Sequence, residues 1–358
     1  MSRIRVLVVE DSLTVRKRLV EILNDDPELE VVGEAADGKT CIEMCRRLRP
    51  DVLTLDMVLP VLSGLAATEY IMAYFPTPIL IVSASANRGE VFKTYDALAA
   101  GALDVLEKPK ADSTDVDWEN RLVFKVKLIS RIKPITHLKG RRRDGRARPA
   151  PPAPPRRSPG YRLVAIGTST GGPAAVVEIL KNLPGDFPLP VLLVIHIDEM
   201  FARHLAEWIE SQSVLPVRYA MDREALPGVG HGLVLMAPPN RHLVVAGGRL
   251  SLNGTAERHS CRPSIDTLFE SLAVEFGKQS IACLLTGMGK DGAAGLLAIR
   301  NAGGLTLAQD EATSVVFGMP AEAVKLNAAE RVLGVHEFAP ALAALAGVGN
   351  EVGVRARP

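Results

Sequence analysis

The chain has 358 residues, of which 47% are hydrophobic and 23% charged, and its formal net charge is +1. This length allows two domains with sizeable cores, and the composition is that of a globular protein rather than a disordered one. The near-neutral charge argues against a protein-wide electrostatic field for nucleic acid or membranes, and every apolar run is too short to span a bilayer.

Cysteine usage and the N-terminus indicate the compartment. The chain begins with a strand-like run instead of the apolar stretch of a signal peptide. Its four cysteines include no CxxC pair, so we expect a reducing compartment, no disulfide framework and no zinc site. Cys41 and Cys45 are expected to pack on one face of a helix. Together these features predict a cytoplasmic protein.

Strand-like and helix-like segments alternate through the first third of the chain. Five apolar runs are typical of strands, at residues 4–9, 31–35, 52–55, 79–82 and 104–106. Because a helix between successive strands returns the chain to the same edge, this alternation predicts a doubly wound parallel sheet in an α/β domain.

Charged side chains gather at the ends of these predicted strands. Glu10 and Asp11 follow the first strand, Asp56 follows the third, Ser83 the fourth and Lys108 the fifth. Because parallel strands end at one edge of a sheet, we expect these groups to cluster. Three carboxylates repel one another unless a cation such as Mg²⁺ lies among them, and a lysine attracts anions such as a phosphoryl group. Ordinary acidic residues near helix N-termini are the alternative.

This region resembles the receiver domain of two-component response regulators over roughly residues 1–130. The matching motifs are Val9-Glu10-Asp11-Ser12, Leu55-Asp56-Met57, Pro60, Gly64, Ser83-Ala84 and Glu107-Lys108-Pro109. The resemblance implies a flavodoxin-like domain in which Asp56 accepts a phosphoryl group, and Glu10, Asp11 and Asp56 hold Mg²⁺. Ser83 and Lys108 would then contact the phosphoryl group, and a chemotaxis-type histidine kinase would be the phosphodonor.

Residues 134–160 interrupt the alternation. They contain a proline-rich run at 149–155 and eight basic residues against a single acid. This composition predicts a semi-rigid linker between domains at 1–133 and 161–348, and we expect a disordered tail at 349–358. The alternative for the linker is that its arginines bind an acidic partner or lipid.

The alternation resumes after the linker. Apolar runs at 163–166, 191–195, 232–236, 281–285 and 305–308 are typical of strands, and glycine-rich corners separate them. They predict a second doubly wound parallel α/β domain, with a Rossmann-like arrangement.

Three of these predicted strands end in groups suited to acyl transfer. Ser169 follows the first strand in a glycine turn, His196 follows the second, and Asp291 lies beyond the fourth. At one sheet edge they would supply a nucleophile, its base and the acid that orients the base. Thr170 and Met288 are the candidate backbone donors for an oxyanion.

Other interpretations of these residues stay open on the pattern alone. Gly167-Thr168-Ser169-Thr170-Gly171 matches GxSxG, but the chain order Ser–His–Asp differs from that of α/β-hydrolases. Neither GxGxxG nor GxxxxGK[ST] is present, which argues against a nucleotide-binding loop. Taken singly, a serine in a glycine turn can be a helix cap, a strand-end histidine a core residue, and an aspartate between glycines a turn residue.

Residues 161–348 resemble the catalytic domain of chemotaxis-type protein-glutamate methylesterases, the CheB family. The matching stretches are 166–173, 237–243, 262–266, 285–292 and 317–320. The resemblance implies that Ser169 is the nucleophile, His196 its base and Asp291 the orienting acid, with the Met288 amide as oxyanion donor. It also implies phosphorylation-activated hydrolysis of glutamate γ-methyl esters on chemoreceptors, deamidation of glutamine, no cofactor for the ester reaction and an interface between the two domains.

Some positions depart from the families' common pattern. Val105 stands where a switch aromatic is often found, and Ser63 replaces an aspartate before Gly64. Thr168, Lys290 and the stretch 197–201 lie beside the predicted catalytic residues. They leave open a phospho-controlled binding module of a non-standard chemosensory pathway, with weak or altered esterase activity. A DNA-binding output is disfavoured, because residues 161–348 alternate strands and show no helix-turn-helix.

Overall fold

The structure is a computed structural model that describes residues 3–84, 87–108, 116–132 and 160–348. The chain divides into two compact units, Met1–Arg143 and Asp144–Pro358. The predicted tail and the predicted linker, apart from Gly160, lie outside the described residues, so the proposed domain boundaries stay predictions. No helix among the described residues is both long and apolar enough to cross a membrane.

The first unit is a five-stranded parallel sheet with the strand order β2-β1-β3-β4-β5. Its strands are β1 (Ile4–Val9), β2 (Leu29–Ala35), β3 (Val52–Leu55), β4 (Ile79–Ser83) and β5 (Asp104–Glu107). Its helices are α1 (Leu13–Asp25), α2 (Gly38–Leu48), α3 (Gly64–Tyr74), α4 (Arg88–Ala99) and α5 (Val116–Ile129). This strand order is the flavodoxin-like one, which confirms the predicted fold class.

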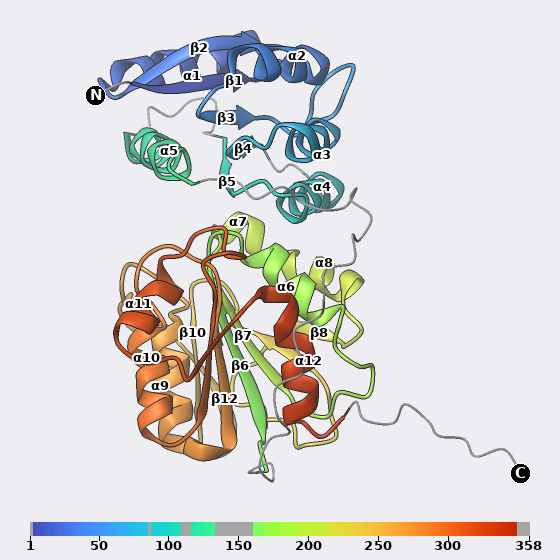
Figure 1. Cartoon of the computed structure of the whole chain (residues 1–358), viewed down its shortest axis with the longest axis vertical. Helices are drawn as coiled ribbons and strands as arrows, with labels where there is room; N and C mark the ends of the chain where they lie inside the picture. The colour runs from blue at the N-terminus through green and yellow to red at the C-terminus, as the bar shows by residue number, and fades with distance from the viewer. Residues whose placement is uncertain (1–2, 85–86, 109–115, 133–159, 349–358) are drawn as a thin grey trace, which may run out of the picture. The chain divides into compact units, whose positions relative to one another are not determined.

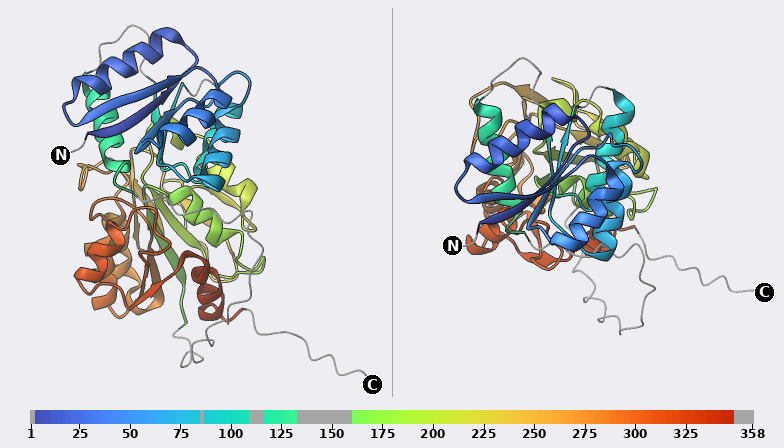
Figure 2. Two further views of the ribbon diagram at one scale, coloured as in Figure 1. Left: turned by 45° about the horizontal axis from the view of Figure 1, so that its top comes forward. Right: turned by 90° about the horizontal axis from the view of Figure 1, so that it is seen from above.

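Helices cover both faces of this sheet. Helix α1 packs beside α5 on one face, and α2, α3 and α4 follow one another on the other (Figures 1 and 2). The buried strands β3 and β4 carry side chains that are inaccessible on both faces, as a sheet covered on both sides requires.

The turn into α3 explains two residues near Asp56. The Ser63 hydroxyl accepts a hydrogen bond from the Ala66 N–H, so the serine caps the helix as an aspartate would. At Gly64, an added Cβ would lie 2.2 Å from the Asp56 carbonyl oxygen. Only glycine lets this helix start so close to the end of β3.

The second unit is a seven-stranded parallel sheet with the order β14-β13-β12-β6-β7-β9-β8, accompanied by the antiparallel pair β10-β11. Its strands are β6 (Leu163–Thr168), β7 (Val191–Ile195), β8 (Val217–Tyr219), β9 (Val234–Met236), β10 (His242–Ala246), β11 (Arg249–Asn253), β12 (Ser280–Leu284), β13 (Leu305–Gln309) and β14 (Arg331–Leu333). Its helices are α6 (Gly172–Leu180), α7 (Glu199–Ala202), α8 (Leu205–Gln212), α9 (Ile265–Glu275), α10 (Ala293–Asn301), α11 (Met319–Lys325) and α12 (Val335–Leu345), with a 3-10 turn η1 (Gly277–Gln279).

Helices α9, α10 and α11 cover one face of this sheet, whereas α6 and α12 lie on the other (Figure 1). A continuous apolar core joins the sheet to α9 and α10 and includes the fully buried Phe269 and Leu296. The second predicted parallel α/β domain is therefore confirmed. The prediction missed β8, β10, β11 and β14.

Strand β6 lies at the topological switch point of this sheet. The chain proceeds from β6 to β7 on one side and returns later to β12 on the other. Register pairs Thr168 with Ile195 and Gly167 with Leu284, so all three strands end at the same level. In parallel sheets, such an edge is where ligands bind.

Candidate active site

Ser169 is the first residue after β6, in the turn that leads into α6. Its N–H donates to the Thr286 carbonyl at 3.0 Å, and its own carbonyl accepts from the Gly172 N–H at 2.7 Å. Gly171 has φ +77°, which glycine adopts without strain, and α6 begins at Gly172, one residue before the predicted Pro173. The half-buried Ser169 is thereby held between two strand ends.

The loop after β12 approaches Ser169 closely because it contains Gly287. A Cβ built on Gly287 would lie 2.8 Å from the Ser169 Cβ and 2.7 Å from the Met319 sulfur. Real side chains do not pack at such distances. Glycine at this position therefore allows the loop that carries Met288 to lie against the serine.

His196 is the first residue after β7. Its N–H donates to the Thr168 carbonyl at 3.0 Å, and the strand register continued by one residue places it beside Ser169. Adjacent strands lie about 4.8 Å apart, so the two backbones are neighbours. Among the described contacts, however, no hydrogen bond joins the Ser169 hydroxyl to the imidazole. Catalytic hydrogen bonds are often long before substrate binds.

Asp291 lies beyond β12, with a side chain that is 3% exposed. One carboxylate oxygen accepts from the Ser264 hydroxyl at 2.8 Å, and the other accepts from the Ile265 N–H at 2.7 Å. The Asp266 N–H also donates, at 3.1 Å. These donors form the N-terminus of α9, whose dipole favours a negative charge. The aspartate is thus anchored to a helix end and is not merely a turn residue.

Asp291 and His196 form a pair. The His196 Nε2 lies 3.0 Å from an Asp291 oxygen, an ion-pair distance without the alignment of a hydrogen bond. Burial acts to lower the pKa of His196, but interactions with Asp291 and Cys261 outweigh it and raise the pKa to about 9. Burial would raise the pKa of Asp291, but the neighbouring imidazole and the donors at the start of α9 lower it.

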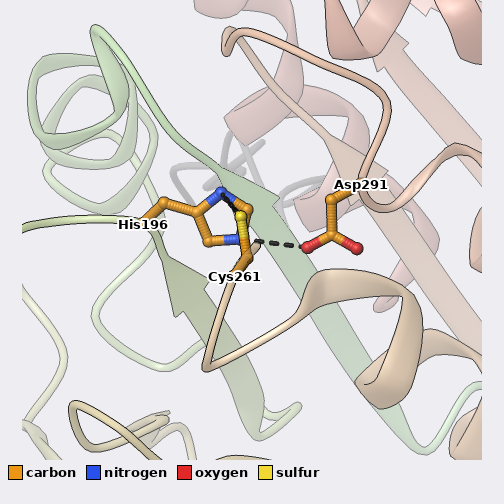
Figure 3. Close-up of side chains that lie close together, drawn as sticks. All are labelled: His196, Cys261 and Asp291. Carbon is orange, nitrogen blue, oxygen red and sulfur yellow. Dashed lines mark hydrogen bonds and ion pairs between the residues drawn. The ribbon is translucent and has the colours of Figure 1, made fainter. Parts of the chain in front are cut away.

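Cys261 contacts the other ring nitrogen of His196, a contact that the sequence did not reveal. Its Sγ lies 3.6 Å from the His196 Nδ1, and its thiol also meets the His259 carbonyl at 3.4 Å. Figure 3 shows the thiol over the His196 ring and the Asp291 carboxylate beside it, with a contact to each ring nitrogen. The Nδ1 that Ser169 would need therefore faces a thiol.

His242, which the sequence analysis did not single out, holds the start of α9. The buried His242 accepts the Ser264 N–H on its Nδ1 at 3.1 Å, and its Nε2 lies 3.1 Å from the Ala256 carbonyl. This network assigns the proton to Nε2. His242 therefore fixes Ser264, which in turn donates to Asp291. The residues were visible in the sequence, but their contact joins segments more than 20 residues apart.

The candidate oxyanion donors lie beside this group. Among the described residues, the N–H groups of Thr170 and Met288 donate no hydrogen bond, so both are available. Met288 and Asp291 line a pocket of about 420 Å³ together with His259, Ser260, Cys261, Gly289 and Lys290. Cys261 and Asp291, which both contact the His196 ring, thus line one pocket.

The departures from the common pattern differ in what they contact. The buried Thr168 donates its hydroxyl to the Thr286 carbonyl at 2.8 Å and so ties β6 to the end of β12. Lys290 is exposed and lines the pocket, where it can meet a substrate. In the stretch 197–201, Phe201 is fully buried and anchors α7.

The first unit holds the predicted carboxylates together. Lys108 Nζ lies 2.7 Å from a Glu10 oxygen and 2.8 Å from an Asp56 oxygen. Oxygens of Glu10, Asp11 and Asp56 all lie within 4.8 Å of one another. Burial raises the pKa values of Glu10 and Asp56, although Lys108 opposes the rise. Burial lowers the pKa of Lys108, but the two carboxylates outweigh it and raise that pKa.

This cluster fits a hard divalent cation and a phosphoryl group. Glu10 and Asp56 are buried while Asp11 is exposed, so one carboxylate of the cluster is in contact with solvent, from which a hydrated ion would come. Ser83 is 1% exposed, and its hydroxyl has no hydrogen-bond partner among the described residues. A buried donor without a partner is costly and is satisfied if an anion arrives beside it. Pro109, part of the predicted motif, lies outside the described residues.

A flavodoxin-like domain with an acidic pocket, followed by an α/β domain with a serine, a histidine and an aspartate at its switch point, defines a response regulator with a hydrolase domain. Residues 6–115 match the family described as the response regulator receiver domain, and residues 164–342 match that described as CheB methylesterase.

Relatives match along almost the whole chain. A protein of Anaeromyxobacter dehalogenans named protein-glutamate methylesterase/protein-glutamine glutaminase 2 is 43% identical over 95% of this chain and 96% of its own. A protein of Myxococcus xanthus named protein-glutamate methylesterase/protein-glutamine glutaminase 4 is 43% identical over 95% of this chain and 96% of its own. The solved catalytic domain of Thermotoga maritima CheB methylesterase is 35% identical, covers 51% of this chain and 97% of its own, and has a TM-score of 0.48. The chain belongs to the CheB family of protein-glutamate methylesterases/protein-glutamine glutaminases and is a hydrolase.

Proposed function

We propose that this protein hydrolyses glutamate γ-methyl esters on chemoreceptors, with Ser169 as nucleophile, His196 as its base and Asp291 as the orienting acid. The observation that carries the proposal is the pairing of His196 with an aspartate anchored at the start of α9, one strand away from Ser169. Deamidation of glutamine would follow the same route, because either leaving group gives the same acyl-enzyme.

The reaction proceeds through an acyl-enzyme. Asp291 engages Nε2, so Nδ1 is the nitrogen left to take the proton of Ser169 as its oxygen attacks the ester carbonyl. The N–H groups of Met288 and Thr170 donate to the oxyanion that forms. The protonated His196 returns this proton to the departing methoxide, which leaves as methanol. Water, deprotonated by the same nitrogen, then releases the glutamate side chain and restores the serine.

Phosphorylation of the first unit would control this activity. Asp56 is the proposed acceptor, and a chemotaxis-type histidine kinase is the proposed donor. Glu10, Asp11 and Asp56 would hold Mg²⁺, which would supply the positive charge that phosphoryl transfer needs. Ser83 then donates its unpartnered hydroxyl to the phosphoryl group, and Lys108 exchanges its Asp56 contact for the new charge.

Three further features rest on the sequence alone and stay proposals. We retain residues 1–133 and 161–348 as the two domains and 134–160 as their linker. The cytoplasmic location rests on cysteine usage. The interface between the receiver and esterase domains rests on their order in the family.

Methanol release tests the proposed reaction. Membranes with methylated chemoreceptor are incubated with the full-length protein, with and without Mg²⁺ and a small phosphodonor. We expect release that the phosphodonor stimulates, and a fall to background for Ser169→Ala. Ser251→Ala, in β11 away from the site, is the matched control and should keep the wild-type rate. A Ser169→Ala protein with the wild-type rate would refute the proposal.

The alternative function is a phospho-controlled binding module with little esterase activity. The absence of a Ser169–His196 hydrogen bond among the described contacts favours it. It predicts receptor binding that depends on the phosphodonor without any methanol release. The same assay, combined with receptor co-sedimentation, separates the two functions.

A further inference from the structure

Cys261 presents its sulfur to the nitrogen that the proposed reaction uses. Its Sγ lies 3.6 Å from the His196 Nδ1, and Cys261 lines the open pocket of about 420 Å³. The other three cysteines are buried, so Cys261 is the thiol that solutes can reach. Cysteine sulfur and histidine nitrogen are the two ligand types that zinc prefers.

The separation of these two atoms suits one zinc ion. Zinc binds cysteine sulfur at about 2.3 Å and histidine nitrogen at about 2.1 Å, with tetrahedral angles. Those values place the two ligand atoms about 3.6 Å apart. The ion would therefore replace the thiol proton once the side chains of Cys261 and His196 turn to bring it into the plane of the ring, where the Nδ1 lone pair lies. The oxidation states stay unchanged, because the thiol loses only a proton as the sulfur–zinc bond forms.

Asp291 supplies the group that commonly stands behind a zinc-bound histidine. Such histidines usually contact a carboxylate through their second ring nitrogen, which fixes the ring and increases its basicity. The Asp291 oxygen lies 3.0 Å from Nε2, and α9 already holds this carboxylate in place. The ligand-type atoms of His196, Cys261 and Asp291 all lie within 4.8 Å of one another.

The neighbouring group of His259, Asp266 and Asp291 is a weaker candidate. Arg258 and His259 already pair with the Asp266 carboxylate, at 3.6 and 3.1 Å. A guanidinium beside the carboxylate repels a cation and occupies its oxygens. Neither Cys261 nor His196 forms an ion pair with an arginine among the described residues, and of those that line the pocket of Cys261 the exposed Lys290 is the only lysine or arginine.

We propose that Cys261 Sγ and His196 Nδ1 bind Zn²⁺ reversibly, with water from the pocket completing the coordination, and that the bound ion inhibits the esterase. The inhibition rests on the proposed function, because it removes the nitrogen that accepts the proton of Ser169. The binding itself does not depend on that function. With two protein ligands instead of the four of structural sites, the ion is exchangeable. The sequence predicted no zinc site, because the two ligands lie 65 residues apart and match no spacing motif.

Cobalt titration tests the site without any activity measurement. Co²⁺ replaces Zn²⁺ and shows a thiolate-to-metal charge-transfer absorption when sulfur binds it. We expect this absorption to saturate at one ion per chain in the full-length protein and in Cys283→Ala, which removes the buried thiol of β12. Cys261→Ser and Cys261→Ala should both lose it, each with its folded state checked by circular dichroism. Absorption that persists in both Cys261 variants would overturn the site.

Zinc inhibition of methanol release tests the consequence. Each protein is compared with its own zinc-free rate. We expect wild type and Cys283→Ala to lose activity with added Zn²⁺ and to recover it with EDTA in the absence of a reductant. The zinc concentration for half-inhibition should rise by about 10–100-fold in Cys261→Ser. Equal sensitivity in Cys261→Ser, or recovery that needs a reductant, contradicts the inference.

The two measurements separate the two proposals. Cobalt absorption that depends on Cys261, in a protein that releases no methanol, would refute the esterase and leave the metal site standing. Methanol release that depends on Ser169, without the absorption, would refute the metal site alone.

Discussion

Replacement of Asp291 by asparagine isolates the charge that the site places behind His196. The substitution keeps the size of the side chain but removes its negative charge. The amide has a single acceptor oxygen, whereas the carboxylate accepts from the Ser264 hydroxyl and from two N–H groups of α9. At least one of these donors must then face the NH₂ group of the asparagine.

The structure sets the size of the expected losses in stability and in catalytic rate. Hydrogen bonds to a charged group contribute about 1.5–3 kcal/mol, against about 1 kcal/mol for neutral ones, and an anion at a helix start contributes about 0.5–2 kcal/mol. We therefore expect a loss of about 2–4 kcal/mol in the free energy of unfolding. The pKa of His196 rises from 6.5 to about 9, which corresponds to about 3 kcal/mol of stabilisation of the imidazolium. Asp291 and Cys261 both contribute to this stabilisation. Loss of charge and of the correct tautomer should lower kcat on the order of 10³–10⁴-fold.

Urea unfolding and methanol release measure these two quantities on the same protein. Asp266→Asn is the matched control, because Asp266 is also a buried carboxylate of α9 but contacts His259 and Arg258 instead of His196. It should lose comparable stability and keep its rate within about tenfold. Activity is measured below the unfolding transition, so that loss of folded protein does not mimic loss of catalysis.

Two results would refute this reasoning. Asp291→Asn with wild-type kcat would show that His196 needs no carboxylate. Equal losses of rate in Asp291→Asn and Asp266→Asn would show that the aspartate acts only through the fold of α9.

Four other measurements test the same account. The base His196 must be neutral, so kcat/KM should rise with pH through about 9, and Cys261→Ser should move the midpoint lower because Cys261 helps to raise this pKa; a pH–rate profile checks both. Gly287→Ala places a Cβ 2.8 Å from the Ser169 Cβ, so methanol release should fall at least about tenfold while the far-ultraviolet circular dichroism stays unchanged. Lys108→Met leaves Glu10 and Asp56 buried without their cation and should destabilise the first unit by about 3–5 kcal/mol in urea, with loss of phosphodonor stimulation. Removal of residues 1–133 should raise the basal rate of methanol release, and an unchanged or lower rate would contradict control by the receiver domain.

The sequence predicted most of the sheet architecture because buried parallel strands are continuous apolar runs. All ten predicted strands exist, with ends within two residues of the observed ones. Of the missed strands, β8 and β14 are short, with three residues each. The antiparallel pair β10-β11 lies outside the main sheet, where alternation of strand and helix gives no signal.

The candidate site was predictable where the backbone alone places it. Ser169, His196 and Asp291 each follow a strand, and parallel topology brings such ends to one edge. Cys261 and His242 act through side chains that meet across loops, which neither periodicity nor strand ends can indicate. The same limit applies to the anchoring of Asp291, because it depends on where α9 begins in space.

One nitrogen of His196 has three competing partners. The thiol of Cys261 occupies Nδ1 in the structure, and the proposed reaction requires the same atom for Ser169. A neutral hydrogen bond contributes about 1 kcal/mol net, so displacement of the thiol slows the reaction only about fivefold. A zinc ion must instead dissociate before the nitrogen is free. A cysteine at position 261 therefore leaves the esterase active in the absence of metal but makes it sensitive to metal, a property that alanine or serine at this position would not confer.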